Sequence, residues 1–531
     1  MSDIIIGTVI SDQDTPTFET IRVKLMAGRH VKPGMLLRIP VSRPEQTALI
    51  ARVRSAYENN PNERAEDINV RDTLGIDANY PSEEDSTTIY RIAEADLLEE
   101  MIYRVDTESS IDGNNAPLEA PEIVSIRFPQ NLPISGAPVY EADGIEITQA
   151  LGLSDNAKDD LFIGYTTSGD TTKVILKRES IQRHMFICGT TGSGKSYAMG
   201  VIAEELLKND LPVIFLDTQD EYSAFVHAHN GKVVVPGEDF TIRISSLTES
   251  ELLDLLPDAM KQSALQSDIV AKAFGQLQIQ RQSDEIAKFT IDDLLKEIEK
   301  VAPAMVAKAG DLPRVIDTTQ RRTAILKNDR IFGSGNLDWR TNMYPCMAIN
   351  CKNLSSSQLQ SIATAVLREL QNLRLKGHIP PYAMIIDEAH LFVPQDSGSP
   401  CKQIIREGVR IGRHHGICLV LMTQSPVDID KSVIRQCNTR LVFALEPDQL
   451  DAIRGVKADA SEEMLRSLPK MPRGTCLLSG TYESIKHTIP VKIRQRRTQD
   501  SEGGKAPDIF ADMKTKWIQE INELKTRQKG N

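Results

Sequence analysis

The fold of this chain is decided by the stretch Gly189-Thr190-Thr191-Gly192-Ser193-Gly194-Lys195-Ser196, which matches the phosphate-binding pattern G-x-x-x-x-G-K-[ST]. The apolar run Met185-Phe186-Ile187-Cys188 precedes it and an amphipathic stretch follows it, so the order is strand, glycine loop, helix. Such a loop points its backbone N–H groups at phosphate oxygens, while the lysine reaches the terminal phosphates and the serine holds magnesium. The sequence therefore predicts a nucleoside triphosphate site formed by these eight residues and Tyr197, with Mg2+ on Ser196.

Length and composition narrow the class of protein. The chain has 531 residues, more than one hydrophobic core usually serves, so we expect two or three domains. Its net charge of -12 argues against a uniformly basic nucleic-acid coat but allows a narrow basic channel. Seven cysteines without metal-ligand spacing predict reduced core thiols. Since the sequence shows no basic leader and no apolar run of about 20 residues, we expect a cytoplasmic protein without a membrane span.

The first part of the chain predicts a small domain of strands. Residues 1–150 contain short β-rich runs separated by Gly, Pro and Asp clusters, which is typical of a small β-barrel. Between Tyr57 and Thr88 the composition becomes acidic and polar with little periodicity, which predicts a long loop or an excursion from the barrel.

The rest of the chain predicts an α/β protein with a RecA-like P-loop NTPase core. Residues 151–245 and 331–497 alternate strands with helices, the signature of a parallel sheet covered on both faces. Residues 246–330 show only helical periodicity and predict a helical insertion in that core. Residues 498–531 predict a linker and a short helix, either docked on a neighbour or solvated. Six apolar runs are expected as core strands: 186–188, 213–216, 347–349, 383–386, 417–421 and 441–445.

Two acids end one of these runs, Ala383-Met384-Ile385-Ile386-Asp387-Glu388. In doubly wound sheets the carboxyl ends of the strands form the ligand-binding edge. There Asp387 can hold magnesium through its water shell, and Glu388 can polarise the water that attacks the γ-phosphate. Such a run is by itself an ordinary strand end, but downstream of a phosphate loop it predicts a catalytic pair.

Two other strand ends carry polar candidates. Asp217 follows the run 213–216 and, together with Glu221, can shape the magnesium and water network; the alternative is a loop with solvated acids. Gln424 follows the run 417–421, where its amide can sense the γ-phosphate and relay hydrolysis to a moving element.

Positive charge gathers between Lys402 and His415. At helical spacing Arg406, Arg410 and Arg413 share one face, which can meet a neighbour's nucleotide or a DNA backbone; a solvated helix face is the alternative. An arginine supplied across a subunit interface would stabilise transition-state charge. Arg183, just before the first core strand, is another candidate near the phosphates.

Taken together, these motifs resemble the HerA branch of the HerA/FtsK ATPases in order and spacing. The likeness covers most of residues 180–497 and the β-rich start is similar to the small HAS-type barrel of that family. The resemblance implies a homohexameric ring with ATP and Mg2+ sites between subunits and double-stranded DNA threaded through the centre. The matching stretches are 183–196, 216–223, 385–390, 412–416 leading to 423–426, 433–440 and 468–474.

The resemblance also assigns roles by position. For the arginine that acts in trans, Gly412-Arg413 fits the family's Gly-Arg-Lys pattern best, although His414 replaces the lysine, and Arg410 lies in a second near match. Thr218-Gln219-Asp220 stands where a His-Gly pair is commoner, which leaves the role of Glu221 open. The remaining assignments are Lys195 and Ser196 to the phosphates and magnesium, Asp387 and Glu388 to magnesium and water, Asp217 to the second strand's acid, Gln424 to the sensor and Arg183 to the arginine before the loop.

The function that the resemblance implies is an ATP-dependent DNA translocase or helicase, working in DNA repair or antiviral defence. Its expected partner is a NurA-like nuclease or a sirtuin-like NAD-hydrolysing effector, by analogy with family members. The same analogy implies that the N-terminal barrel serves oligomerisation or the docking of that partner. The alternative is an ATP-regulated hexameric scaffold for such an effector, with translocation secondary. A conjugative or secretion ATPase would share the motor core, but it usually needs membrane coupling, for which the sequence offers no segment.

Overall fold

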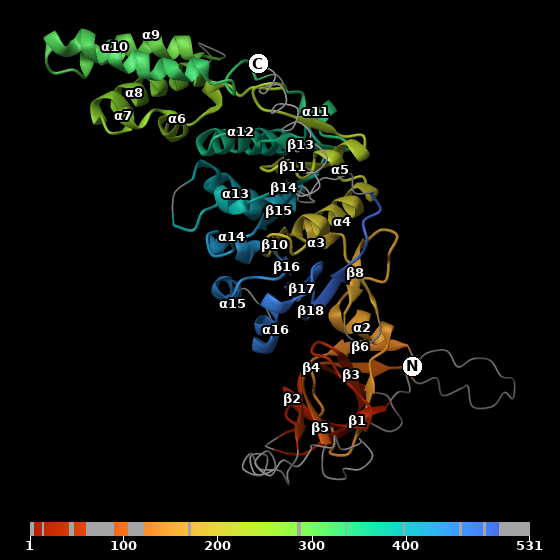
Figure 1. Ribbon diagram of the computed structural model, residues 1–531. Coiled ribbons are helices and arrows are strands. Elements are labelled where there is room, and N and C mark those ends of the chain that lie inside the picture. Colours follow the sequence, from red (N-terminus) through yellow and green to blue (C-terminus); the bar gives the residue numbers. More distant parts are fainter. Residues whose placement is uncertain are drawn as a thin grey trace, which may run out of the picture.

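The computed structural model describes residues 5–12, 15–41, 47–59, 90–104, 122–167, 171–283, 288–335, 337–396, 399–455, 459–481 and 485–498. A barrel of strands lies at one end of the molecule, an α/β core lies in the middle and a group of helices lies at the other end (Figure 1). Most of the predicted loop between Tyr57 and Thr88 lies outside the described residues, although its first three residues belong to a strand. The predicted tail, apart from Thr498, lies outside them as well.

The N-terminal strands close into a barrel, as predicted. β1 pairs with β2 and β7, β3 pairs with β7 and β4, and β5 joins β4 to β2. Alternate side chains fill the interior, among them the fully buried Ile21, Leu37 and Leu49. β6 pairs with β5 beside the closed ring. The bounds are β1 (Ile5–Ile10), β2 (Thr20–Leu25), β3 (Leu36–Pro40), β4 (Thr47–Asn59), β5 (Tyr90–Tyr103), β6 (Ile123–Arg127) and β7 (Pro138–Glu141), followed by α2 (Gly144–Leu151).

The core is a sheet of eleven strands in the order β12-β13-β11-β14-β15-β10-β16-β17-β18-β8-β9. All six predicted strands are present and parallel, although the last begins at Thr439 and ends at Val442. The parallel strands are β10 (Met185–Cys188), β11 (Val213–Asp217), β12 (Lys232–Val234), β13 (Cys346–Asn350), β14 (Tyr382–Ile386), β15 (Ile417–Thr423) and β16 (Thr439–Val442). The antiparallel extension consists of β17 (Thr475–Gly480), β18 (Ile489–Ile493), β8 (Leu161–Thr166) and β9 (Lys173–Leu176).

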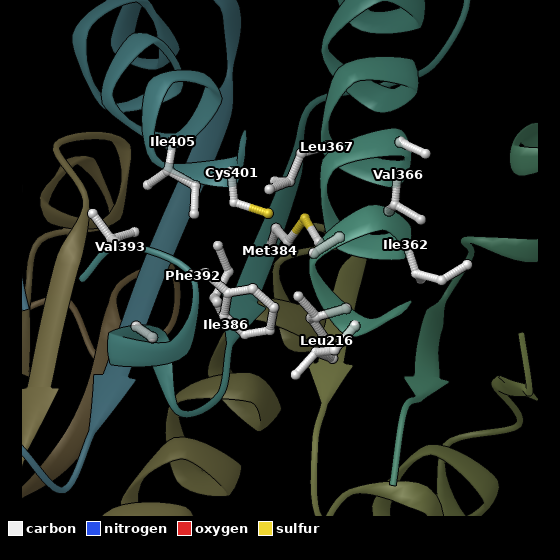
Figure 2. Close-up of a cluster of buried hydrophobic side chains, with 14 of the residues drawn as sticks. Leu216, Ile362, Val366, Leu367, Met384, Ile386, Phe392, Val393, Cys401 and Ile405 are labelled. Atoms are coloured by element: carbon white, nitrogen blue, oxygen red, sulfur yellow. The ribbon is translucent and has the colours of Figure 1, made fainter. Parts of the chain in front are cut away.

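Helices bury the apolar faces of this sheet. On one face Met384 and Ile386 of β14 point toward Leu367 of α12 (Ser356–Leu375) and Ile405 of α13 (Pro400–His415) (Figure 2). These four side chains are each at most 1% exposed. α12 starts where it does because Ser355 and Gln358 form a capping box, in which each side chain accepts the other's backbone N–H. α4 (Lys195–Lys208) begins within the phosphate loop that follows β10 and packs in the core.

The predicted helical insertion is confirmed between β12 and β13. Its α9 opens with a capping box made by Thr290 and Asp293, and buries Leu294, Ile298 and Val301 on one face. The insertion contains α6 (Glu249–Leu255), α7 (Asp258–Lys261), α8 (Ala264–Gln282), α9 (Ile291–Val301) and α10 (Leu312–Thr323). It projects from the core at the end opposite the barrel (Figure 1).

A buried ionic cluster joins the barrel to the core. Arg52 of β4 donates from Nη1 to Asp459 Oδ2 (3.0 Å) and to the Thr488 carbonyl oxygen (2.9 Å). His487 lies between two carboxylates, with Nδ1 2.9 Å from Asp459 Oδ2 and Nε2 3.3 Å from Glu99 Oε1 of β5. Arg52, Glu99 and His487 are each at most 9% exposed. The cluster therefore couples the two parts through charges of which Arg52, Glu99 and His487 are largely shielded from water, while the side chain of Asp459 is 34% exposed.

All seven cysteines are buried and reduced, as the composition predicted. Burial raises the pKa of each thiol, for example that of Cys401 to about 12. Within the described ranges, no helix has the length and apolar character needed to cross a membrane.

Candidate active site

The phosphate loop is held tightly between neighbouring strand ends. Gly189 N donates to the Thr423 carbonyl oxygen (3.3 Å), Thr190 N donates to that of Ala444 (2.7 Å), and Gly474 N donates to that of Ser193 (2.8 Å). The loop therefore sits against the ends of β15 and β16 and against the turn before β17. Its backbone N–H groups and the N-terminus of α4 together form an anion-binding concavity.

Two glycines of the loop are required by this close packing. Gly194 has φ +113°, and a Cβ there would lie 3.0 Å from the backbone of Gly474. At Gly189 a Cβ would lie 2.6 Å from the Cβ of Phe443. Any larger residue would push these neighbours away from the loop.

Lys195 is buried at the mouth of the loop. Its Nζ donates to the Thr190 carbonyl oxygen at 3.0 Å, and its side chain is 9% exposed. Burial lowers the pKa of Lys195, whereas the carboxylates of Glu388 and Asp387 oppose that shift. The lysine thus lies between the loop and the two predicted catalytic acids, where terminal phosphates would be held.

Asp387 ends β14 and faces several other acids. Its Oδ2 accepts from Thr218 Oγ1 (3.3 Å) and its Oδ1 from the Glu388 N–H (3.0 Å). Burial, followed by the nearby charges of Glu388, Glu221 and Asp217, raises the pKa of Asp387 to about 8. A carboxylate so surrounded by negative charge gains most from a divalent cation, so these oxygen donors fit Mg2+.

Glu388 combines a strained backbone with a carboxylate oxygen that accepts no hydrogen bond from the described residues. Its φ of +48° lies in the left-handed region, which is costly for a residue with a side chain. Oε1 accepts from Gln219 Nε2 at 3.3 Å. Oε2 is buried and has no hydrogen-bond partner among the described residues, although His390 Nδ1 lies 3.3 Å away. An oxygen of this kind is suited to accept a hydrogen bond from a water molecule.

Asp217 is fully buried, and backbone amides occupy its carboxylate. Oδ1 accepts from the N–H groups of Gln219 (3.2 Å), Asp220 (2.8 Å) and Glu221 (3.1 Å), and Oδ2 from that of Tyr222 (2.9 Å). The side chain therefore shapes the loop after β11. That loop in turn delivers Thr218 to Asp387 and Gln219 to Glu388. Asp217 thus acts on the site through the loop, and Glu221 acts through its charge on Lys195 and Asp387.

Gln424 reaches the phosphate loop directly. Its Oε1 accepts from Thr191 Oγ1 at 2.8 Å, which places the expected sensor beside the loop. Tyr197 instead faces the last described segment: Arg496 N donates to its hydroxyl (2.8 Å), and the Arg496 guanidinium lies 4.9 Å from its ring centroid. Arg496 also donates to the Ser196 carbonyl oxygen and so covers the first turn of α4.

The three predicted arginines lie at the opposite edge of the sheet. Arg183 precedes β10, whereas the phosphate loop follows it, about 13 Å away along the strand. Arg410 and Arg413 are on the last turns of α13, which ends where β15 begins. Within a single chain the strand separates Arg183 from the phosphate loop, so its place near the phosphates stays a prediction that depends on a neighbouring subunit.

His184, the residue after Arg183, bonds to the backbone of α13 and β15. Its Nδ1 accepts from the Leu419 N–H (3.0 Å), so its Nε2 donates to the Val409 carbonyl oxygen (2.9 Å). Burial lowers the pKa of His184 to about 4, so the ring is neutral at pH 7. The contact ties the segment after Arg183 to the turn of α13 that carries Arg410.

Arg406 behaves differently from the other two arginines of α13. It pairs with Asp430, as does Lys402 at 3.2 Å. Arg410 and Arg413 are exposed and have no ion-pair partner among the described residues. These two side chains are available to another molecule.

Several residues of the site were not predicted from the sequence. Thr218 and Gln219 were noted only as departures from a family pattern, yet they contact the two predicted catalytic acids. His390 follows the acids by two residues, which was a usable signal. Arg496 is 300 residues from its partner Ser196, so nothing local in the sequence indicates it.

Comparisons with known proteins agree with this geometry. Residues 161–373 match the family model for the central domain of helicase HerA, and residues 371–474 match the model for the HerA-like C-terminal domain. The probable helicase MJ1565 of Methanocaldococcus jannaschii is 25% identical, over 69% of this chain and 72% of its own length. The DNA double-strand break repair helicase HerA of Sulfurisphaera tokodaii is 22% identical, over 74% of this chain and 79% of its own.

The solved structure of VirB4 from Thermoanaerobacter pseudethanolicus shares the fold. It is similar with a TM-score of 0.51 and 15% identity, and the match covers 64% of this chain and 98% of that one. The predicted resemblance and fold class are confirmed, since the two family models together span residues 161–474. The chain belongs to the HerA family of P-loop ATP hydrolases.

Proposed function

We propose that the chain works as a homohexameric ring that uses ATP to move on double-stranded DNA. The observation that carries the proposal is the division of the site. The phosphate loop and its acids lie at one edge of the sheet, whereas two exposed arginines without ion-pair partners among the described residues lie at the other. A second copy that places its arginine edge on the first copy's phosphate loop would complete the site. The relatives named as DNA helicases support duplex DNA as the track.

In this proposal each side chain has one task. Lys195 binds the terminal phosphates, Glu388 Oε2 orients the attacking water, and Gln424 reports the γ-phosphate to the end of β15. Ser196 and Asp387 would hold Mg2+. When bound, that ion would neutralise charge that develops on the phosphates. Arg413 is the first choice for the arginine acting in trans, and Arg410 and Arg183 are the alternatives.

A partner protein completes the proposal. The barrel lies at the end of the molecule away from the helical insertion (Figure 1), so in a ring the barrels would gather on one face. We propose that this face receives a nuclease or an NAD-hydrolysing effector. In the scaffold alternative, nucleotide occupancy sets the state of such an effector while translocation is secondary.

The experiment measures ATP hydrolysis with and without linear duplex DNA. We expect DNA to stimulate the wild type, and Lys195→Ala and Glu388→Gln to lose at least about a hundredfold in rate. Lys208→Ala is the matched control, because this lysine lies at the other end of α4 and pairs with Glu205. If DNA neither binds at low salt nor changes the rate, with or without a partner, the motor function is refuted.

The shared site has its own test. Lys195→Ala and Arg413→Ala should each be inactive alone. Mixed rings should regain activity, because the intact phosphate loop of an Arg413→Ala subunit can then lie against the intact Arg413 of a Lys195→Ala subunit. Random mixing at equal amounts would restore about a quarter of the interfaces. If the mixture stays inactive although the subunits exchange, Arg413 does not act in trans, and the same mixture with Arg410→Ala or Arg183→Ala identifies the residue.

A further inference from the structure

His390 lies between the predicted water-polarising carboxylate and the end of the sensor strand. Its Nδ1 is 3.3 Å from Glu388 Oε2 and shares a hydrogen bond of 3.1 Å with Thr423 Oγ1. The imidazole side chain is 20% exposed and Thr423 is fully buried. One ring nitrogen therefore faces both groups in a largely water-excluded place.

The hydroxyl that His390 contacts is that of Thr423, which belongs to the segment in contact with the phosphate loop. Thr423 is the last residue of β15, and its carbonyl oxygen accepts from Gly189 N at 3.3 Å. The next residue, Gln424, accepts from Thr191 Oγ1 at 2.8 Å. Two consecutive residues thus touch the loop, and one of them also touches His390.

Glu388 needs outside support to keep its carboxylate in place. Its left-handed backbone, φ +48°, is unfavourable unless the surroundings hold it. On the Oε1 side the support is a hydrogen bond of 3.3 Å from Gln219. On the Oε2 side His390 Nδ1 lies 3.3 Å away, and it is anchored by Thr423.

We propose that His390 is a positioning residue that holds Glu388 Oε2 in the direction of the attacking water and links it to the β15 end. The inference rests on the proposed role of Glu388. A shift of Gln424 on loss of the γ-phosphate would move Thr423, and the imidazole would carry that displacement to the carboxylate. His390 touches neither the nucleotide loop nor the reacting atoms, so its effect is on the rate of the chemical step and not on nucleotide affinity.

The test compares steady-state hydrolysis without DNA in matched variants. His390→Leu removes the nitrogen but keeps the bulk, and we expect kcat to fall at least about tenfold with KM for ATP changed less than about twofold. His390→Asn restores a polar atom near the Nδ1 position and should keep kcat within about threefold. Thr423→Val should repeat the loss and Thr423→Ser should spare it. Combining His390→Leu with Thr423→Val should be no worse than either alone, because both break one link.

Controls distinguish a loss of the His390 contact from a folding defect and from a failure of the motor function. His227→Leu, at an exposed position of α5 (Ser223–Ala228), should keep the wild-type kcat. The inference is overturned if His390→Leu keeps the wild-type kcat, or if His390→Asn is as impaired as His390→Leu while both melt like the wild type. Should His390→Leu fail to fold, the Thr423 pair and His390→Asn still decide. If Glu388→Gln hydrolyses ATP normally, the role of Glu388 itself fails, and absent DNA stimulation would refute only the motor function.

Discussion

Asp387 and Asp217 are buried aspartates at the ends of neighbouring strands, yet their carboxylates meet different surroundings. Burial, together with the charges of the neighbouring acids, raises the pKa of Asp387 to about 8, and two groups donate to it among the described residues. An acid whose folded pKa exceeds its unfolded value of about 3.8 loses stability as pH rises between those values. We therefore expect Asp387→Asn to raise the melting temperature of the nucleotide-free, metal-free protein by roughly 2–5 °C at pH 7.5, and much less at pH 5.

Asp217→Asn is the matched control for that change. Burial raises the pKa of Asp217 as well, but four backbone N–H groups donate to its two oxygens. An asparagine turns one of those acceptors into a donor, so this variant should melt lower at every pH. Calorimetry in buffer with a chelator measures both. An Asp387→Asn protein that melts at or below the wild-type temperature at pH 7.5 would contradict the account.

At this scale the sequence indicates the residues whose chemistry is local and misses those that depend on tertiary placement. Lys195 and Ser196 stand inside one loop, and Asp387 and Glu388 stand at one strand end, so spacing alone predicts them. Gln219 and Arg496 reach the site only because a loop and a distant segment return to it. Asp217 was predicted to shape the magnesium and water network, and its oxygens accept from the backbone of its own loop.

Gly412 of α13 is closely packed against its neighbours, whereas Gly275 of α8 has open space beside it. Alanine at each position therefore tests how the two helices pack. In α13 a Cβ on Gly412 would lie 2.4 Å from the Ile417 carbonyl oxygen and 2.8 Å from His184 Cε1. Gly412→Ala should therefore displace α13 and lower the melting temperature, at a cost of about 1–3 kcal/mol. In α8 a Cβ on Gly275 would meet nothing within 4 Å. Gly275→Ala should stabilise that helix by about 0.5–1 kcal/mol.

The same pair also tests the arginine edge. Because His184 links α13 to the segment after Arg183, Gly412→Ala should reduce ATP hydrolysis of the assembled protein, whereas Gly275→Ala should leave it unchanged. Calorimetry and hydrolysis rates on the two variants check this. A Gly412→Ala protein with unchanged melting and activity would show that α13 is not seated where the contacts place it.

The apolar runs of the parallel core were predictable, and the strands of the antiparallel extension were not. The strands β10, β11 and β13 to β16 are continuous apolar runs, as expected of strands buried on both faces. The strands β17, β18, β8 and β9 extend the sheet in antiparallel order and were not predicted. In β18 the residues alternate between buried and more accessible positions over only five residues, too few for a clear period.

At the scale of the whole molecule, the ionic cluster between barrel and core should respond to pH. Burial alone would lower the pKa of His487, but the carboxylates of Asp459 and Glu99 outweigh it and raise the pKa above 6.5. A histidine raised in this way stabilises the fold fully below pH 6.5, and that stability is lost as pH rises through the folded value. We expect the wild type to melt above His487→Gln at pH 5.5, with the difference shrinking toward pH 9.

Thermal unfolding of both proteins across that pH range measures the effect. Taking the difference between them cancels the titrating groups that do not interact with His487, and the neighbouring Lys486 and Arg52 are present in both proteins. His378→Gln, at an exposed histidine, should show no such trend. A difference between wild type and His487→Gln that stays constant with pH would mean that the ring is uncharged between the two carboxylates.

The burial of all seven thiols makes this chain convenient for optical measurements of motion. Maleimide dyes react with thiolates. Buried thiols with raised pKa values form almost no thiolate at neutral pH, and the dye cannot reach them. A cysteine introduced at an exposed site of the barrel and another on α8 would therefore be labelled selectively, with no native cysteine replaced. Energy transfer between the two dyes could then follow the two ends of one subunit during each turnover.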